Sequence, residues 1–170
     1  MSLKLIGAIL IIISCGGFGF KLAASHRREE TTLRQLVSVL DFMECELQYR
    51  LTPLPELCRQ AAAESSGLIW QIFLALAMEL EDQISPDVER CMNAALSKVK
   101  DIPAHSLEAL SLLVRSLGRF DMEGQLKGLD SVRQDCRRNL DALNKNKDVR
   151  LRNYQTLGLC AGAALAILFI

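Results

Sequence analysis

The side chains that most often carry catalytic or metal chemistry are sparse in this chain. Its two histidines, His26 and His105, lie far apart, and neither has a ligand or a nucleophile at the spacing of a metal site or a catalytic triad. We therefore expect both to be solvated polar residues. The sequence also lacks a glycine-rich phosphate-binding loop. These observations predict no enzyme, no cofactor and no metal, so an ATP-driven function would need a partner that supplies the ATPase.

The cysteines are the other candidates for chemistry. They are spread along the chain without a CxxC pair: Cys15, Cys45, Cys58, Cys91, Cys136 and Cys160. This spacing argues against a zinc site and against a thioredoxin-like redox centre. Most of them occupy positions where a small hydrophobic residue would serve, which is usual for free cysteines in a reducing compartment.

The charge balance bounds the kind of partner. Lysine plus arginine equals aspartate plus glutamate, at 20 each in 170 residues. A nucleic-acid partner would need a basic excess on one face, so we expect none. The carboxylates of Asp41, Glu44 and Glu46 lie on an amphipathic stretch, and we predict that they form its solvated face. Once two apolar ends are set aside, the length fits one domain.

Both ends of the chain are apolar enough to predict membrane anchors. The sixteen residues between Lys4 and Lys21 are uncharged, and with their flanks they could cross a hydrocarbon core of about 30 Å. The segment 154–170 would measure about 25 Å as a helix. We predict anchors at 1–24 and 154–170 and a cytoplasmic domain at 25–153, because the basic residues cluster on the inner side of both spans. These are Lys21, Arg27, Arg28, Arg34, Lys145, Lys147, Arg150 and Arg152.

A second interpretation of the N-terminus stays open. The residues Ile12 to Cys15 resemble the lipobox of bacterial lipoproteins, in which Cys15 would be lipidated. Against this, the apolar run continues five residues past Cys15, and a single lysine precedes it. Lipidation would also carry four further thiols into an oxidising space.

The region between the ends predicts an all-α fold: a six-helix, bundle-like cytosolic domain between two terminal transmembrane helices. Apolar residues recur at intervals of three and four, and no alternating strand pattern occurs. Thr31 or Thr32 should cap the first helix, which closes before Pro53. Pro53 and Pro55 should start a short second helix, which ends at residues 65–67. The third helix should be the buried centre of the domain, lined by Trp70, Phe73, Leu76, Ala77 and Leu80.

The remaining helices have clear start and stop signals. Ser85 and Pro86 should open the fourth helix, which ends near Asp101. Pro103 and Ser106 should open the fifth, with apolar positions at Leu107, Leu110, Leu113, Val114 and Leu117 and a stop at Gly118. Asp121 should cap the sixth helix. Because no proline follows, this helix should continue into the C-terminal span, with a stripe at Leu126, Leu129, Val132, Cys136, Leu140 and Leu143.

Four blocks of sequence carry a resemblance to a known family. They are LKLIGAILII at the N-terminus, ECELQYRLTPLPE, SLGRFDMEGQ, and LGLCAGAALAILFI at the C-terminus. Helix ends explain much of the two central blocks but leave Tyr49 and Gln125 as polar groups that could join helices or face a partner. In this order and at this length, the blocks resemble the stage III sporulation protein AB family, whose helical domain is similar to the platform proteins of type II secretion and type IV pilus systems.

The resemblance implies a non-enzymatic platform subunit in the mother-cell membrane that faces the forespore, with the central domain in the cytoplasm. It also implies partners: a secretion-type ATPase and other membrane subunits of a channel complex, with self-association left open. The family has no known catalytic residues. The positions that match its pattern are structural or docking candidates: Glu44, Glu46, Tyr49, Pro53, Leu54, Gly118, Asp121 and Gln125. A membrane-anchored signalling or dimerisation module is the alternative, although the apolar stripe of the sixth helix covers only about three heptads.

Overall fold

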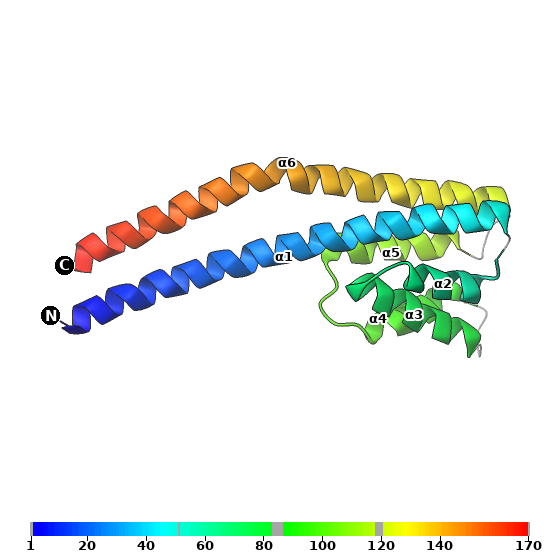
Figure 1. The fold of residues 1–170 in the computed structure, drawn as a ribbon, viewed down its shortest axis with the longest axis horizontal. Coiled ribbons are helices and arrows are strands. Elements are labelled where there is room, and N and C mark those ends of the chain that lie inside the picture. The colour runs from blue at the N-terminus through cyan, green and yellow to red at the C-terminus, as the bar shows by residue number, and fades with distance from the viewer. Residues whose placement is uncertain (1, 51, 83–86, 118–120, 170) are drawn as a thin grey trace. The chain divides into compact units, whose positions relative to one another are not determined.

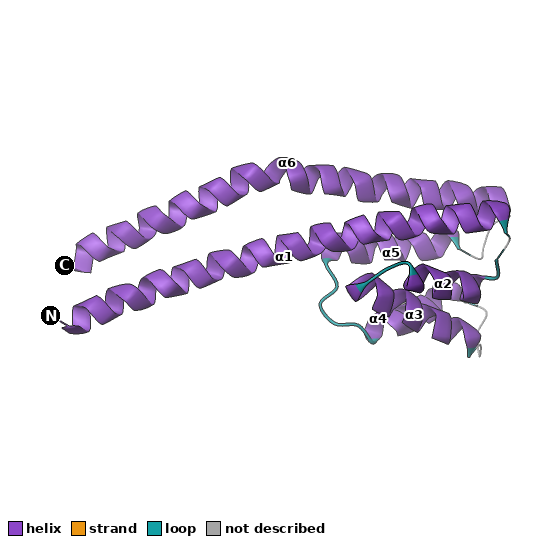
Figure 2. Cartoon of the chain, viewed as in Figure 1, coloured by secondary structure: helices purple, strands orange, loops and turns teal. Residues whose placement is uncertain are grey.

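The computed structural model of the protein describes the backbone of residues 2–50, 52–82, 87–117 and 121–169, and within these the side chains from 24 to 145. The described ranges contain six helices in this order: α1 (Ser2–Tyr49), α2 (Leu54–Ala63), α3 (Gly67–Glu81), α4 (Val88–Ser97), α5 (Ala104–Ser116) and α6 (Met122–Phe169) (Figure 1). No strand occurs in these ranges (Figure 2). The all-α prediction is confirmed.

The chain divides into two compact units. One consists of Met1–Arg28 and Asp141–Ile170, and the other is Glu29–Leu140. The boundaries between the units fall within α1 and α6. The unit Glu29–Leu140 contains the C-terminal part of α1, helices α2 to α5, and the N-terminal part of α6, and it alone is called the compact unit below. Within the part of the chain that the structure describes, no helix is both long enough and apolar enough to cross a bilayer. The two terminal spans therefore stay predictions.

The first predicted helix boundary is wrong. α1 runs from Ser2 to Tyr49 without interruption, so neither Thr31 nor Thr32 caps a helix there. The reason is that no proline lies between residues 2 and 49, and Thr32, only 4% exposed, is instead part of the packed face. The predicted end before Pro53 is confirmed. The predicted continuity of α6 is also confirmed, because the helix extends from Met122 to Phe169.

The core of the compact unit is apolar and draws on every helix. Along the core-facing side of α1, the residues at three- and four-residue intervals are fully buried: Leu33, Leu36, Leu40 and Met43. α2 packs against α3, α3 against α4, and α4 against α5. From α6, Leu129, Val132 and Cys136 close the core, as their periodicity predicted. The other three positions of the predicted α6 stripe, Leu126, Leu140 and Leu143, are half-buried, so the stripe is confirmed only in part.

Two apolar side chains expected on packed faces are partly exposed. Trp70 on α3 is 44% exposed and Leu107 on α5 is 43% exposed. Phe73, Leu76, Ala77 and Leu80 are buried as predicted. The prediction was wrong for Trp70 because α3 is apolar on more of its circumference than its neighbours cover. On α5, the small residues Ser106 and Ala109 take buried positions beside Leu110, and Leu107 is left outside.

The helix ends follow the predicted signals only in part. α4 is capped by Asp87, whose side chain accepts a hydrogen bond from the backbone N–H of Glu89 at 3.0 Å. Ser85 and Pro86, predicted to open this helix, lie outside the described residues. α4 ends at Ser97 and not near Asp101, which has a left-handed backbone (φ 59°). Pro103 precedes α5 as predicted.

Candidate functional site

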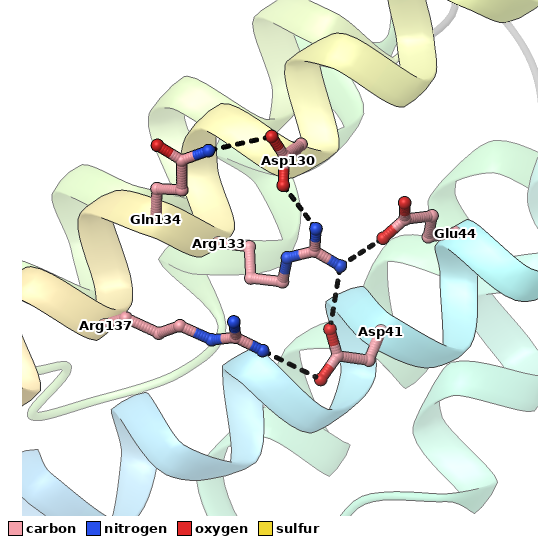
Figure 3. A network of polar contacts seen from close by, with 6 residues as sticks. All are labelled: Asp41, Glu44, Asp130, Arg133, Gln134 and Arg137. Atoms are coloured by element: carbon pink, nitrogen blue, oxygen red, sulfur yellow. Dashed lines mark hydrogen bonds and ion pairs between the residues drawn. The ribbon is translucent and has the colours of Figure 1, made fainter.

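The structure brings the two central sequence blocks to the same end of the compact unit. α1 and α6 run in opposite directions there, and Arg133 of α6 contacts Asp41 and Glu44 of α1 (Figures 1 and 3). Tyr49 lies five residues after Glu44 on α1. Because α6 runs in the opposite direction with the same rise of about 1.5 Å per residue, the residues of α6 level with Tyr49 come before Arg133, in the first turns of α6. The end of α1 therefore lies beside the start of α6. We call this region the docking end, defined by Tyr49, Pro53, Asp121 and Gln125.

Below the docking end, Arg133 is the centre of a polar cluster. Its Nη1 atom donates to Asp41 Oδ1 at 3.0 Å and to Glu44 Oε2, and its Nη2 atom donates to Asp130 Oδ1 (Figure 3). The outer contacts are Arg137 Nη2 to Asp41 Oδ2 at 3.7 Å and Gln134 Nε2 to Asp130 Oδ2 at 2.8 Å. A single guanidinium thus connects two carboxylates of α1 with one of α6.

The charge of Arg133 is stabilised by its surroundings. Burial alone would lower its pKa, but the hydrogen bonds to Asp130 and Asp41 and the charges of Glu44 and Asp130 outweigh this effect and raise the pKa. The Arg133 side chain is only 20% exposed, and its Nε atom is buried with no hydrogen-bond partner among the described residues. The cluster therefore places a permanent cation between the helices, where it fixes their register.

Glu46 is a structural residue, contrary to the prediction of a solvated face. It is 8% exposed. Its Oε2 atom accepts a hydrogen bond from Thr52 Oγ1 at 3.1 Å, and its Oε1 atom lies 3.4 Å from Arg50 Nη1. The carboxylate is buried because it holds the turn between α1 and α2. Glu44 is half-buried for a different reason, its contact with Arg133, and only Asp41 is exposed as predicted.

Of the other candidates in the first block, Tyr49 is an exposed residue at the end of α1, and Pro53 and Leu54 form the start of α2. Tyr49 is 76% exposed at the last position of α1. Pro53 is exposed and precedes α2, and its carbonyl oxygen accepts the backbone N–H of Leu57 at 2.8 Å. Leu54, the first residue of α2, is half-buried. Of the candidates in this block, Tyr49 has the largest exposed side chain.

In the second block, Asp121 acts as predicted. Its Oδ1 atom accepts a hydrogen bond from the backbone N–H of Gly124 at 3.1 Å, which caps the first turn of α6. Its carbonyl oxygen accepts the backbone N–H of Gln125 at 3.0 Å. Gln125 is half-buried, and Gly118 lies outside the described residues. Asp121 thus sets where α6 begins.

Sequence reasoning missed two residues. Arg133 lies on the same helix face as the buried residues Leu129 and Cys136, and this polar interruption of an apolar stripe was a signal that could have found it. Gly128 is the second. A Cβ atom on it would lie 2.2 Å from Ser116 Cβ, so the close approach of α5 and α6 requires glycine there. No local sequence pattern identifies such a contact.

The environments of the described cysteines and of His105 are set by burial and by contacts within the fold. Cys58, Cys91 and Cys136 are buried, and Cys45 is exposed. Burial raises the pKa of Cys58 to about 12 and, helped by the charge of Asp135, that of Cys136 to about 11, so both thiols are protonated at neutral pH. Among the described residues, no group of three or more His, Cys, Asp or Glu side chains could hold a metal ion. His105 is partly exposed, and its Nδ1 atom lies 2.6 Å from Glu29 Oε1.

Comparison with known proteins confirms the resemblance seen in the sequence. The family model described as stage III sporulation protein AB matches residues 4–170. Stage III sporulation protein AB of Bacillus subtilis (strain 168) is 25% identical over 171 residues, which is 99% of each chain. A solved structure of stage III sporulation protein AB covers 72% of this chain and 98% of its own, with a TM-score of 0.61 at 19% identity, and supports the fold. Since the family model matches nearly its whole length, the chain belongs to the stage III sporulation protein AB family.

Proposed function

We propose that this chain is a non-enzymatic platform subunit of the channel or secretion-like complex between mother cell and forespore, and that it docks a secretion-type ATPase. The observation that carries the proposal is the family match over residues 4–170, which indicates a role in sporulation. An all-helical body agrees with a part that transmits force or positions other subunits.

In this proposal, the two apolar ends hold the chain in the mother-cell membrane and the central region lies in the cytoplasm. Two observations support this arrangement. The apolar runs at both ends are flanked by basic residues on their inner sides. α1 and α6 also extend beyond the compact unit as continuous helices, so the chain enters both apolar ends in helical form.

The docking end is the surface that we assign to the ATPase. Tyr49 is 76% exposed there, and exposed tyrosines are frequent anchors of protein interfaces. The residues around it are held by short-range contacts: Asp121 caps α6, Glu46 holds the turn after α1, and Arg133 connects the two helices. An aromatic side chain on such a fixed support loses little conformational freedom when it binds.

Site-specific crosslinking in sporulating cells tests the docking end. A photo-crosslinking amino acid at position 49 should trap the ATPase, whereas the same group at position 107 should not, because Leu107 is 43% exposed but lies on α5. Absence of the ATPase adduct at position 49, with the chain present in the membrane at normal amount, would remove the docking end from consideration. Adducts mainly with other copies of the chain would favour the signalling or dimerisation module.

The native thiol Cys45 tests the topology. It is exposed, so in a chain with Cys15→Ser and Cys160→Ser it is the thiol most open to a membrane-impermeant maleimide. We expect labelling only after the cells are permeabilised. Labelling in intact cells would place the compact unit outside and would contradict the platform proposal.

A further inference from the structure

Helix α3 has an apolar stripe that the core does not use. Trp70 is 44% exposed and Met78 is 55% exposed, and Leu74 between them is half-buried. These three residues, called the α3 stripe, are four residues apart, so successive members are turned by only about 40° around the helix axis. The buried residues Ile72 and Leu76 lie on the opposite side, and the buried Phe73 lies between that side and Trp70. α3 therefore has two apolar faces, and its neighbours cover one.

The surroundings of the α3 stripe are acidic. α3 contains no basic residue, and the exposed Glu81 and Asp82 follow Met78 on the same side of the helix. The segment 54–98 as a whole carries seven acidic and three basic residues. All three basic residues are engaged with acidic residues of the same segment: Arg59 pairs with Glu81, Arg90 with Asp87, and Lys98 Nζ lies 2.5 Å from Glu79 Oε1. The segment keeps four more acidic than basic residues. A ligand of this face meets an apolar ridge beside negative charge.

We propose that the α3 stripe binds an amphipathic helix of another protein whose apolar side is bordered by lysine or arginine. Side chains spaced by four residues form a ridge of about 12 Å, the kind of surface that packs between the side chains of a second helix. Tryptophan is enriched among the residues that dominate binding energy, and methionine adapts to varied apolar partners. The acidic border selects basic flanks on the ligand and speeds association.

Two other occupants fit the charges less well. A second copy of the chain would bring the same acidic surface against itself, and like charges across an interface cost binding energy. An anionic lipid surface would be repelled by Asp82 and by the net negative charge of the segment 54–98. The proposal is independent of the docking end, which uses α1 and α6, and its test involves neither an ATPase nor sporulation.

The test uses Trp70 as reporter, because it is the single tryptophan of the chain. The full chain is placed in nanodiscs of zwitterionic lipid and titrated with a tryptophan-free helical peptide that carries leucines on one face and lysines beside them. We expect a saturable blue shift of the Trp70 emission and reduced quenching by acrylamide. A peptide with the same leucines, in which glutamate replaces every lysine, should bind at least tenfold more weakly. No saturable change, or equal binding of both peptides, would overturn the proposal.

Variants of the chain locate the binding. Met78→Ser should weaken binding of the lysine peptide at least fivefold. Asp82→Lys should weaken binding of the lysine peptide and strengthen binding of the glutamate peptide. Unfolding of the variant cannot produce such a reversal. Leu107→Ser is the matched control, because Leu107 is 43% exposed on another helix, and it should leave binding within twofold. An equal loss in Leu107→Ser would overturn the assignment.

Two further measurements decide against the other occupants. Vesicles of phosphatidylglycerol should not shift the Trp70 emission beyond the effect of zwitterionic vesicles. Analytical ultracentrifugation in neutral detergent should show the same association state for the parent chain and for Met78→Ser. A shift with the anionic vesicles would assign the stripe to a membrane surface, and a dimer abolished by Met78→Ser would assign it to a second copy. Either result would overturn the proposal.

Discussion

The compact unit joins its helices in two different ways. In the layer of α2, α3 and α4, contacts between helices are apolar, and ion pairs such as Lys98 with Glu79 lie at the exposed rim. Between α1 and α6, apolar residues are combined with the half-buried cluster around Arg133 (Figure 3). The first kind of contact is nondirectional, whereas the second requires particular donors and acceptors to meet.

The apolar contacts and the polar cluster therefore have different roles: the first mainly stabilise the fold, and the second fixes the register of one helix against another. Apolar side chains tolerate small shifts of one helix against another, because any buried area contributes about 25 cal/mol per Å². A shift of α6 along α1 would break the contacts of Arg133 with Asp41 and Glu44, whereas its contact with Asp130 lies within α6 and would remain. We infer that apolar burial, to which every helix contributes, supplies most of the folding energy, and that the Arg133 cluster sets the alignment of α1 and α6 at the docking end. The substitutions below test this division, in order of decreasing effect.

The largest effect should come from Phe73→Ala in α3. Phe73 is fully buried, and removal of such a side chain costs about 3–5 kcal/mol of unfolding free energy. Denaturant unfolding of the full chain, followed by far-ultraviolet circular dichroism, measures the loss. Met78→Ala on the same helix is the control, and because Met78 is 55% exposed it should cost below about 1 kcal/mol. Similar losses in the two variants would contradict the assignment of the energy to the buried face.

Gly128→Ala tests the close contact of α5 with α6. Alanine in a helix is normally favoured over glycine by about 1 kcal/mol, but here its Cβ atom would lie 2.2 Å from Ser116 Cβ. We expect the opposite sign, a loss of about 1–3 kcal/mol from overpacking. Ser116→Gly in the same chain removes the clashing atoms and should restore most of the stability. A stabilising Gly128→Ala, or no rescue by Ser116→Gly, would show that the helices separate easily.

The sequence predicted the parts that depend on local physics. Periodicity predicted the buried residues Leu129, Val132 and Cys136 of α6, and the cap at Asp121 followed from residue type and position. The predicted cap at Thr31 or Thr32 was wrong because nothing there interrupts a helix that already exists. A capping residue can begin a helix, but it does not end the one that precedes it.

The sequence could not predict the parts that depend on tertiary contacts. The exposure of Trp70 depends on how much of α3 its neighbours cover. Arg133 and Gly128 act through residues on other helices, Asp41 and Ser116. The docking end shows the same limit: the sequence named both of its blocks, and only the fold shows that they lie together.

Arg133→Met tests whether charge sets the alignment of α1 and α6. The variant keeps much of the side-chain volume but removes the cation that joins Asp41, Glu44 and Asp130, whereas Asp41 keeps its contact with Arg137. Because these carboxylates are partly exposed and remain accessible to water and ions, we expect a moderate loss of about 1–2 kcal/mol. Arg138→Met is the control, since Arg138 is 74% exposed and should contribute below about 1 kcal/mol. Equal losses in both variants would remove the special role of the cluster.

Asp121→Ala should have the smallest effect and sharpens the comparison most. Removal of a capping carboxylate costs about 1 kcal/mol, and Asp87→Ala at the start of α4 is a matched change, because both side chains accept a backbone N–H at 3.0–3.1 Å. The two variants should therefore unfold at similar denaturant concentrations. They should differ in crosslinking at position 49, because only Asp121 holds the first turn of α6 beside Tyr49. Loss of the ATPase adduct in Asp121→Ala but not in Asp87→Ala would show that the alignment of the docking end can be lost without a difference in global stability. Equal amounts of adduct in both variants would show that the cap of α6 does not position this surface.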